Sequence, residues 1–218
     1  MKRRPAFLIG AGCVLFVAAA TLAVSNHLES ANAARTAEIL TEAFILQADL
    51  PIVNDIPEQD ETSIFNLVVD PVALDYSVPE PPAPVRESIT IDGQEFIGLL
   101  SIPSLGVSLP VNNNIDYPRL RATPCRYFGS AEDGTLVIAA HNYDSHFGRL
   151  GSLEPGDRVT LTNANGIVDT YVVSEVLILA GDAVDEMVAP GEWDLTLFTC
   201  TYSGMERITV RCIREDRL

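Results

Sequence analysis

The chain has 218 residues, 47% of them hydrophobic, and its 30 acidic against 14 basic side chains give a formal net charge of −16 at pH 7. This length suits one globular domain with appendages. The acidic balance excludes nucleic acid as a partner, because that interaction needs a basic surface to neutralise phosphates. Its plain interpretation is solubility.

The first element expected is a membrane-spanning helix over residues 5–24. This stretch of 20 residues carries no charge, and about 20 apolar residues are what a helix needs to cross a bilayer core. Three basic residues within 1–4 favour a cytoplasmic tail and an extracellular remainder. A cleaved signal peptide is the alternative, since the alanines at 18–20 resemble a cleavage site. The apolar core of such a peptide is normally shorter, roughly 7–15 residues.

Residues 25–88 are expected to form a stalk between the membrane and the folded domain. Residues 31–50 are alanine-rich and carry apolar side chains at near-helical spacing, which predicts a short helix leading away from the membrane. Residues 51–86 are acidic and contain closely spaced prolines, which is typical of an extended and fairly stiff segment. A lid over a binding site is the alternative for this segment.

The folded domain is expected over residues 89–218 and to be all-β. Asp92-Gly93 and Asn165-Gly166 are strong hairpin turns. Eight strands without a long helix predict a closed antiparallel barrel, because closure removes exposed strand edges. The predicted strands are 89–91, 95–102, 107–111, 135–140, 157–162, 167–178, 194–200 and 206–214.

Three of these strands place chemically active side chains at their ends. One ends on Cys200, the next opens with Arg207, and an earlier one is followed by His141. A thiol, an imidazole and a guanidinium are the groups of a cysteine acyl-transfer site, in which the thiolate attacks, the imidazole moves protons and the cation stabilises the oxyanion. Alternation along the two strands turns Cys200 and Arg207 away from the apolar face, as a surface groove requires.

These residues resemble the sortases, the membrane-anchored cysteine transpeptidases of Gram-positive bacteria. The likeness runs from residue 97 to residue 214, with Thr-Leu-Phe-Thr-Cys at 196–200, Ile-Ala-Ala-His-Asn at 138–142 and then Arg207, in the family's order. It implies an eight-stranded sortase-like β-barrel with short helices in a membrane-anchored surface protein. The short interval between Cys200 and Arg207 is similar to the class B branch, and the class stays open.

The resemblance also implies a reaction and its partners. A sortase cleaves a C-terminal sorting signal of the Leu-Pro-x-Thr-Gly type through a cysteine acyl-enzyme, and then transfers the protein to an amine. The acceptor is a peptidoglycan precursor amine or a pilin lysine, and the donors are surface proteins that bear the signal. No cofactor and no metal is implied, and no calcium-loop spacing is present. Two rival functions are a membrane-tethered cysteine peptidase that uses water and a non-catalytic surface binding or assembly protein.

The family pattern assigns roles to particular residues. Cys200 is the expected nucleophile, His141 the acid–base group and Arg207 the oxyanion group. Substrate contacts are expected from Thr199, whose alternative is ordinary strand packing, and from Asn142. The loop before the cysteine strand adds three apolar candidates for the substrate groove, namely Met187, Val188 and Trp193, the last of which suits the core equally well.

Several alternatives stay open at this point. His146 competes with His141 for the proton-transfer role, although its surroundings are typical of a loop. Arg211 shares a face with Arg207 and is the fallback cation. Cys125 and Cys212 either form a disulfide, which an extracellular location permits, or are two buried free thiols. The pair Asp70-Pro71 faintly resembles the lid anchor of pilus-building sortases.

Overall fold

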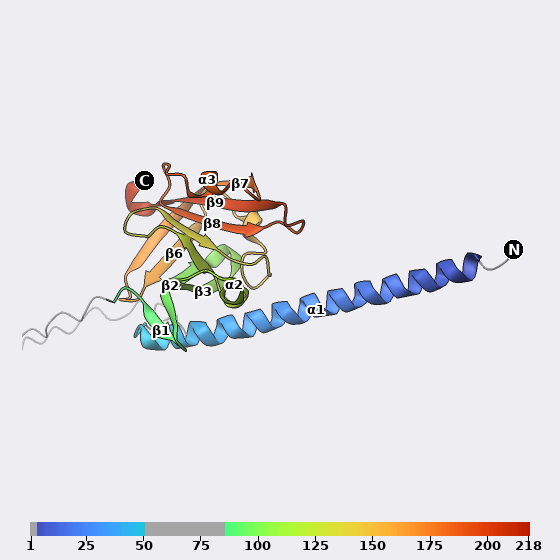
Figure 1. The fold of residues 1–218 in the computed structure, drawn as a ribbon. Helices are drawn as coiled ribbons and strands as arrows, with labels where there is room; N and C mark the ends of the chain where they lie inside the picture. The colour runs from blue at the N-terminus through green and yellow to red at the C-terminus, as the bar shows by residue number, and fades with distance from the viewer. Residues whose placement is uncertain (1–3, 51–85) are drawn as a thin grey trace, which may run out of the picture.

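The protein is a β-barrel resting on one long N-terminal helix (Figure 1). The structure, a computed structural model, describes residues 4–50 and 86–218. The helices are α1 (Arg4–Gln47), α2 (Tyr117–Ala122) and α3 (Val184–Val188), with single 3-10 turns at Pro103–Leu105, Leu150–Ser152 and Glu215–Arg217. The strands are β1 (Ile89–Ile91), β2 (Gln94–Ile102), β3 (Val107–Asn112), β4 (Cys125–Phe128), β5 (Leu136–Ala139), β6 (Arg158–Asn163), β7 (Val168–Ala180), β8 (Leu195–Cys200) and β9 (Glu206–Arg214).

Eight strands close the barrel, as the sequence predicted. The sheet order is β1-β2-β3-β4-β5-β8-β9-β7-β6, and β6 pairs back with β2, so that β2 to β9 form the ring. The predicted strand at 89–91 is β1, which pairs outside the ring with the start of β2. The ring strand that takes its place is β4, which the sequence analysis did not predict.

The expectation of a purely antiparallel barrel is wrong, because β3–β4 and β5–β8 pair in parallel. A parallel pair needs a crossover connection of about a dozen residues or more. Residues 113–124, which include α2, supply it between β3 and β4. The connection from β5 to β8 runs through β6, β7 and α3, and it carries the chain around the barrel before β8 returns beside β5.

The two C-terminal strands alternate as predicted between the barrel interior and an outer apolar layer. Leu195, Leu197, Val210 and Cys212 are fully buried in the main core. Phe198, which points the other way, packs outside the ring in a second cluster with Met187 of α3 and its neighbours. The face that carries Cys200 and Arg207 is therefore the face covered by α3 and the loop around it.

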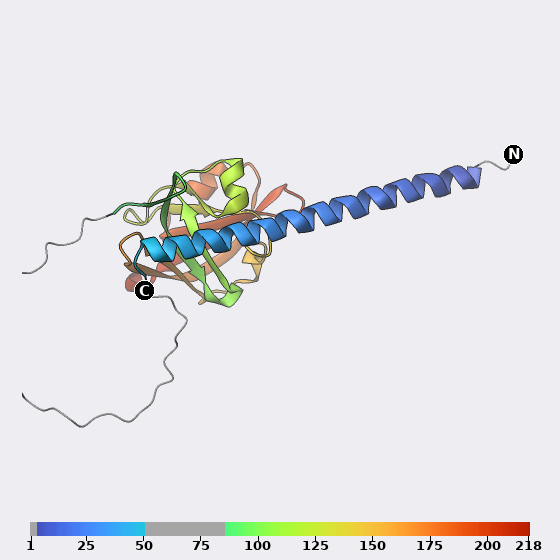
Figure 2. The same ribbon diagram turned by 90° about the horizontal axis from the view of Figure 1, so that it is seen from below.

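Helix α1 is continuous over 44 residues and runs along the barrel (Figures 1 and 2). Its buried side chains, spaced three or four residues apart, form one helical stripe. Leu40 and Phe44 pack in a cluster with the β1–β2 hairpin, and Ala37 joins the main core. The short helix expected at 31–50 is therefore the second half of α1, and it lies on the domain rather than leading away from it.

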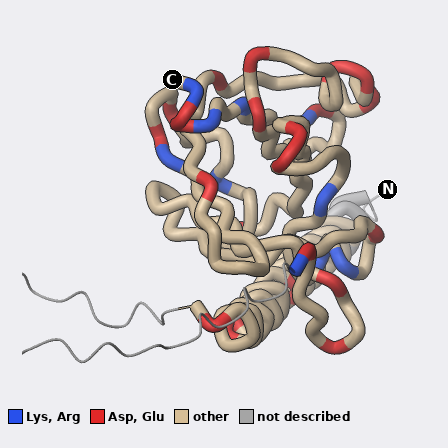
Figure 3. Tube along the Cα trace, turned by 90° about the vertical axis from the view of Figure 1, so that its left-hand side faces the viewer, with Lys and Arg blue, Asp and Glu red and all other residues tan. Residues whose placement is uncertain are grey.

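The N-terminal part of α1 is long and apolar enough to cross a membrane. The apolar stretch begins within the described residues at Ala11, and its side chains are not covered by the barrel. The prolines and acids expected to form the stalk, and Asp70 with them, lie mostly at 51–85, outside the described residues. Figure 3 shows acidic residues spread over many loops of the barrel, with fewer basic residues between them.

Cys125 and Cys212 are both free and completely buried, so the structure has two buried thiols in place of a disulfide. Burial raises the pKa of Cys212 to about 12. Burial, and then the Asp116 carboxylate, raise the pKa of Cys125 to about 12 against a smaller opposing effect of Arg119. Because only a thiolate is a useful nucleophile, both thiols are chemically quiet at neutral pH.

Candidate active site

The ends of three strands bring Cys200, Arg207 and His141 together. Cys200 is the last residue of β8, and its partner across the antiparallel β8–β9 pair is Arg207. On the other side of β8, the parallel register pairs Phe198 with Ala139 of β5. Neighbouring strands lie about 4.8 Å apart, so Cys200 has one strand end on each side of it.

Two hydrogen bonds extend the β5–β8 pairing past the last residue of β5. The amide of Ala140 donates to the carbonyl oxygen of Phe198 at 3.2 Å. The hydroxyl of Thr199 donates to the carbonyl oxygen of Ala140 at 2.9 Å. Since His141 follows Ala140 and Cys200 follows Thr199, the shared register sets His141 beside Cys200. The nucleophile candidate therefore lies between the imidazole and guanidinium candidates.

An apolar groove of about 230 Å³ leads to the Cys200 thiol and the Arg207 side chain. One wall comes from the segment around α2 and from β4, and the other from the β7–β8 connection with α3. The remaining lining residues are Ile115, Leu120, Tyr127, Ala139, Ala180, Gly181, Ala183, Val184, Met187 and Phe198. A groove of this composition suits aliphatic side chains of an extended peptide, with the thiol at its end.

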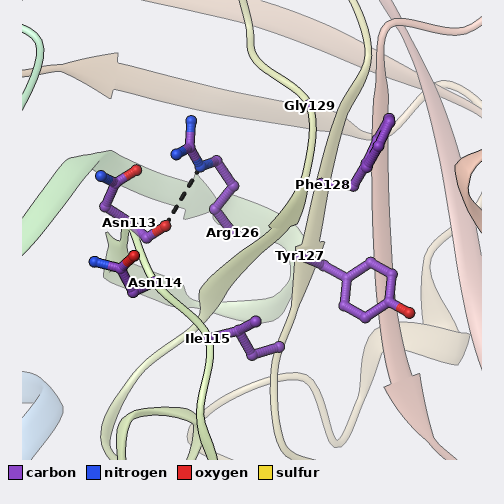
Figure 4. Close-up of a pocket in the computed structure, with 7 residues that line it drawn as sticks. All are labelled: Asn113, Asn114, Ile115, Arg126, Tyr127, Phe128 and Gly129. Carbon is purple, nitrogen blue, oxygen red and sulfur yellow. Dashed lines mark hydrogen bonds between the residues drawn. The ribbon is translucent and has the colours of Figure 1, made fainter.

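A larger and more polar hollow of about 520 Å³ adjoins this groove (Figure 4). Ile115 and Tyr127 line both spaces, which makes the two neighbours. In the polar hollow, Nε of Arg126 donates to the main-chain oxygen of Asn113 at 3.4 Å. Cys200 and Arg207 line the smaller groove and not this hollow.

His141 is held by aromatic neighbours. Its ring stacks on Tyr143 with centroids 4.8 Å apart, and Tyr117 of α2 meets it edge-on at 5.7 Å. Burial, and then the positive charge of Arg121, lower the pKa of His141, while the Glu29 carboxylate acts in the opposite direction. Within the described residues, its Nε2 has no hydrogen-bond partner. The two larger effects therefore favour the neutral form of the ring.

His146 lies behind Tyr143, at 5.5 Å between ring centroids, and is completely buried. Burial, and then the neighbouring His141, lower its pKa to about 4. A histidine that stays neutral and away from solvent is poorly suited to exchange protons with a substrate. The structure therefore places His141, and not His146, at the strand ends.

The two arginines of β9 have different surroundings. Arg207 is partly exposed, and its Nη1 donates to the carbonyl oxygens of Gly204 and Glu206, both at 3.0 Å. Arg211 is buried and lies over the Trp193 ring at 4.3 Å. It donates to Thr196 Oγ1 and to the carbonyl oxygens of Met187 at 3.0 Å and Glu186 at 2.6 Å. Arg211 thus fastens the β7–β8 connection, which leaves Arg207 as the cation of the groove.

The predicted substrate-binding residues separate into three groups. Met187 lines the groove with Cys200, and Asn142 is partly exposed next to His141. Val188 and Trp193 instead line a second space of about 190 Å³, beyond Met187. Thr199 is buried and bonded to Ala140, so it acts through the backbone of the site.

The sequence analysis missed the wall that α2 and β4 provide. Ile115, Leu120 and Tyr127 line the groove, although none of them was predicted as a site residue. Tyr127 opens a Tyr-Phe-Gly-Ser stretch that resembles the sortases, but the four-residue β4 is too short to show a clear alternation, and Ile115 and Leu120 belong to no recognised motif. Over the described residues, no cluster of three or more His, Cys, Asp or Glu side chains could hold a metal ion.

A family model for the sortase domain matches residues 100–215. No curated protein matches the chain closely enough to count as a relative. Among solved structures, the chain is similar to a lid mutant of sortase A from Corynebacterium diphtheriae, at 26% identity and TM-score 0.50, covering 56% of this chain and 70% of that one.

Two further structures are similar to a lesser degree. Sortase A from Corynebacterium diphtheriae matches at 23% identity and TM-score 0.49, covering 56% of this chain and 61% of that one, which is less than two thirds of its length. Sortase C-1 from Actinomyces oris matches at 26% identity and TM-score 0.48, covering 54% of this chain and 72% of that one.

Proposed function

This chain belongs to the sortase family, and from that premise we propose that it is a membrane-anchored cysteine transpeptidase. It cleaves a Leu-Pro-x-Thr-Gly-like C-terminal sorting signal through a Cys200 acyl-enzyme. It then transfers the surface protein to an amine of the cell wall or to a pilin lysine. The observation that carries the proposal is the position of Cys200, between its strand partner Arg207 and the His141 that follows β5.

The reaction starts with a proton transfer from the Cys200 thiol to His141. The resulting thiolate attacks the carbonyl carbon of the Thr–Gly bond, and the electrons of the carbonyl move to its oxygen. The His141 imidazolium gives its proton to the leaving amine as the C–N bond breaks, which leaves a thioester. The acceptor amine then attacks this thioester, His141 takes a proton from it, and the thiolate leaves.

Arg207 stabilises the oxyanion of both tetrahedral intermediates. Its two hydrogen bonds to turn carbonyls use Nη1 alone, and a guanidinium carries five N–H donors in a fixed plane. Nη2 and Nε are therefore left for the oxyanion. The turn carbonyls orient the guanidinium beside Cys200, in the groove that both residues line.

The apolar groove receives the Leu and Pro side chains of the signal. Met187, Val184 and Phe198 supply apolar contacts on the α3 side, and Tyr127 closes the opposite wall. Membrane attachment is assigned to residues 5–24, with the N-terminus in the cytoplasm and the barrel outside. The apolar character of α1 supports the attachment, and the basic residues at 2–4 support the direction.

The test uses the full chain in detergent, its Cys200→Ala variant and a panel of Leu-Pro-x-Thr-Gly-like peptides, with and without triglycine or hydroxylamine. We expect Cys200-dependent cleavage between Thr and Gly, with the amine captured on the new carboxyl end. Cleavage without capture would identify a peptidase. No cleavage, with a thiol that reacts only at alkaline pH, would identify a binding or assembly protein.

Arg207 is tested with two variants. Arg207→Ala is expected to lower the rate of acyl transfer by roughly 10²–10³, as the loss of an oxyanion donor does. Arg207→Lys keeps the charge but loses the planar set of donors. Its rate is expected to lie between those of the native chain and Arg207→Ala. A near-normal rate for Arg207→Ala would assign oxyanion stabilisation to another group.

A further inference from the structure

The active-site end of the barrel faces the apolar part of α1. Helix α1 is continuous from Arg4 to Gln47, so distances along it follow from a rise of about 1.5 Å per residue. Arg121 of α2 forms an ion pair of 2.9 Å with Glu29 of α1. Residue 29 lies five positions after the proposed span ends at residue 24, and α2 lies beside residues 29–36 of α1, about 8–18 Å beyond the span.

The near end of this range lies at the outer edge of the headgroup layer. The hydrocarbon core of a bilayer is about 30 Å thick, and headgroups extend it to about 40–45 Å. Because Tyr117 of α2 contacts His141, the same end of the barrel carries the catalytic residues. Figures 1 and 2 agree that the turn between the red strands β8 and β9 projects from this end, toward the N-terminal half of α1.

The β8–β9 turn presents two apolar side chains to its surroundings. Tyr202 is 89% exposed and Met205 is 74% exposed, and residues 201–205 carry no charge. The turn is well ordered by its own backbone: the amide of Thr201 donates to Glu206, and that of Gly204 to Thr201, at 3.0 and 2.9 Å. Gly204 adopts a positive φ of 72°, which other residues rarely accept.

The turn is also fastened to the wall of the groove. The amide of Gly181 donates to the carbonyl oxygen of Met205 at 2.8 Å, and Arg207 donates to Gly204. A preformed turn therefore holds an aromatic and a thioether side chain outward, next to the thiol. Tyrosine is enriched at membrane interfaces, where its ring is apolar and its hydroxyl stays hydrated.

We propose that the β8–β9 turn is a second membrane contact, in which Tyr202 and Met205 enter the interfacial layer of the bilayer that α1 spans. The partner is the lipid surface, and the proposal rests on the membrane anchoring stated under the proposed function. Glu206 and Asp182 are exposed beside the turn, so the contact is apolar and shallow and gains nothing from anionic lipid. It holds the Cys200 groove against the headgroups.

This contact defines which acyl donors the groove receives. A donor whose scissile segment lies in the headgroup layer reaches Cys200 directly. A donor whose segment extends far into solution has to approach an opening that faces the lipid. The geometry thus favours donors that are themselves held in the membrane next to the cleaved segment.

The position of the turn is tested with tryptophan fluorescence, because Trp193 is the single tryptophan of the chain. The Trp193→Phe/Tyr202→Trp variant of the full chain is placed in phosphatidylcholine vesicles that contain brominated lipids. The matched control is Trp193→Phe/Ile167→Trp. Ile167 is 60% exposed and follows Gly166, which lies beside Leu50 at the far end of the barrel.

We expect strong quenching of the tryptophan at 202 by shallow bromines and none of the tryptophan at 167. Equal emission and equal quenching at the two positions would overturn the proposal. If the Trp193→Phe change prevents folding, the same pair of variants is compared with Trp193 retained as a constant contribution. In either background, the difference in quenching between positions 202 and 167 decides whether the turn contacts the membrane.

A second readout separates this proposal from the proposed activity. The Tyr202→Ser/Met205→Ser variant is assayed with one sorting peptide, free in solution or linked to lipid in the same vesicles. We expect a rate on the free peptide that does not fall and a several-fold loss on the lipid-linked one. Quenching at 202 in a protein without acyl transfer would leave the contact standing and remove the activity. Acyl transfer without quenching at position 202 would leave the activity standing and remove the membrane contact.

Discussion

The hydroxyl of Thr199 donates a hydrogen bond of 2.9 Å to the carbonyl oxygen of Ala140. The next residue after each of them is a catalytic candidate, Cys200 on one strand and His141 on the other. Beyond the last residue of β5, this side-chain bond continues the pairing that the main chain began. This hydrogen bond therefore sets the spacing between the strand ends that carry the thiol and the imidazole.

Thr199→Val is expected to lower kcat more than it raises KM, because it disturbs the catalytic pair and leaves the groove lining intact. It also leaves the buried Ala140 carbonyl without its partner, which costs about 1–3 kcal/mol of stability. Steady-state kinetics and urea unfolding measure the two effects. Thr199→Ser keeps the hydroxyl and is the control. An unchanged kcat in Thr199→Val would show that the strand ends keep their spacing without this bond.

Glu29 and Arg121 are expected to move the pKa of His141 in opposite directions. Arg121 lowers this pKa and Glu29 raises it. Glu29→Gln removes the carboxylate that favours the imidazolium, so the pKa falls; Arg121→Gln removes the opposing cation, so the pKa rises. The His141 Hε1 resonance, followed against pH, measures both. Glu38→Gln, at an exposed position on the same helix, should change nothing. A shift of the same sign in both variants would contradict this account.

His146 is expected to make the protein less stable in acid. Its folded pKa of about 4 lies below the ordinary histidine value of 6.5, so the unfolded chain binds more protons between these values and stability falls as the pH falls through this window. The contribution amounts to about 2 kcal/mol between pH 7.5 and pH 5. Above pH 7 it vanishes, because the ring is neutral in both states.

His146→Phe keeps the buried ring and removes the titration. Urea unfolding in detergent at pH 7.5 and pH 5 should therefore show a smaller loss for the variant than for the native chain. The comparison of the two losses cancels the contribution of the many carboxylates. Equal losses would mean that His146 is protonated without cost in the folded state.

Alkylation at pH 7 is expected to distinguish the thiols of the barrel by their reactivity. Iodoacetamide should modify Cys200 in the folded protein, because Cys125 and Cys212 are buried with pKa values raised to about 12. Mass spectrometry of the proteolytic fragments gives the extent at each position. The Cys200→Ala variant should stay unmodified in the barrel until urea unfolds it. Modification of Cys125 or Cys212 at the rate of Cys200 would contradict the burial.

The alternation of two strands carried most of the predicted site. Leu195 and Leu197 alternate in the first strand, and Ile208 and Val210 in the second, which was enough to direct Cys200 and Arg207 toward the same side. The same alternation made Arg211 a fallback cation, but it could not predict that Arg211 is buried. Periodicity gives the face of a strand, but it cannot show that α3 and Trp193 cover one part of that face and leave another part open.

The elements that sequence reasoning missed depend on long-range packing. Residues 125–128 form a strand only because β3 and β5 accept them on either side. The apolar stripe of α1 was visible as a helical pattern, but Leu40 and Phe44 find their partners in Ile89, Ile91 and Phe96, about fifty residues further along the chain. Val188 and Trp193 belong to the predicted loop, and its path decides which pocket they line.

The packing of the barrel on α1 has a consequence for how the proposed transpeptidase meets its substrates. A domain on a flexible linker samples a range of distances from the membrane, and most of its encounters occur away from the level at which its substrates lie. If α1 is the membrane anchor proposed above, a domain packed on its continuation, through Leu40, Phe44 and the Glu29–Arg121 pair, keeps its Cys200 end at one level above the bilayer. Under that proposal its search for a donor is a search in two dimensions, and lateral diffusion in the membrane sets its pace.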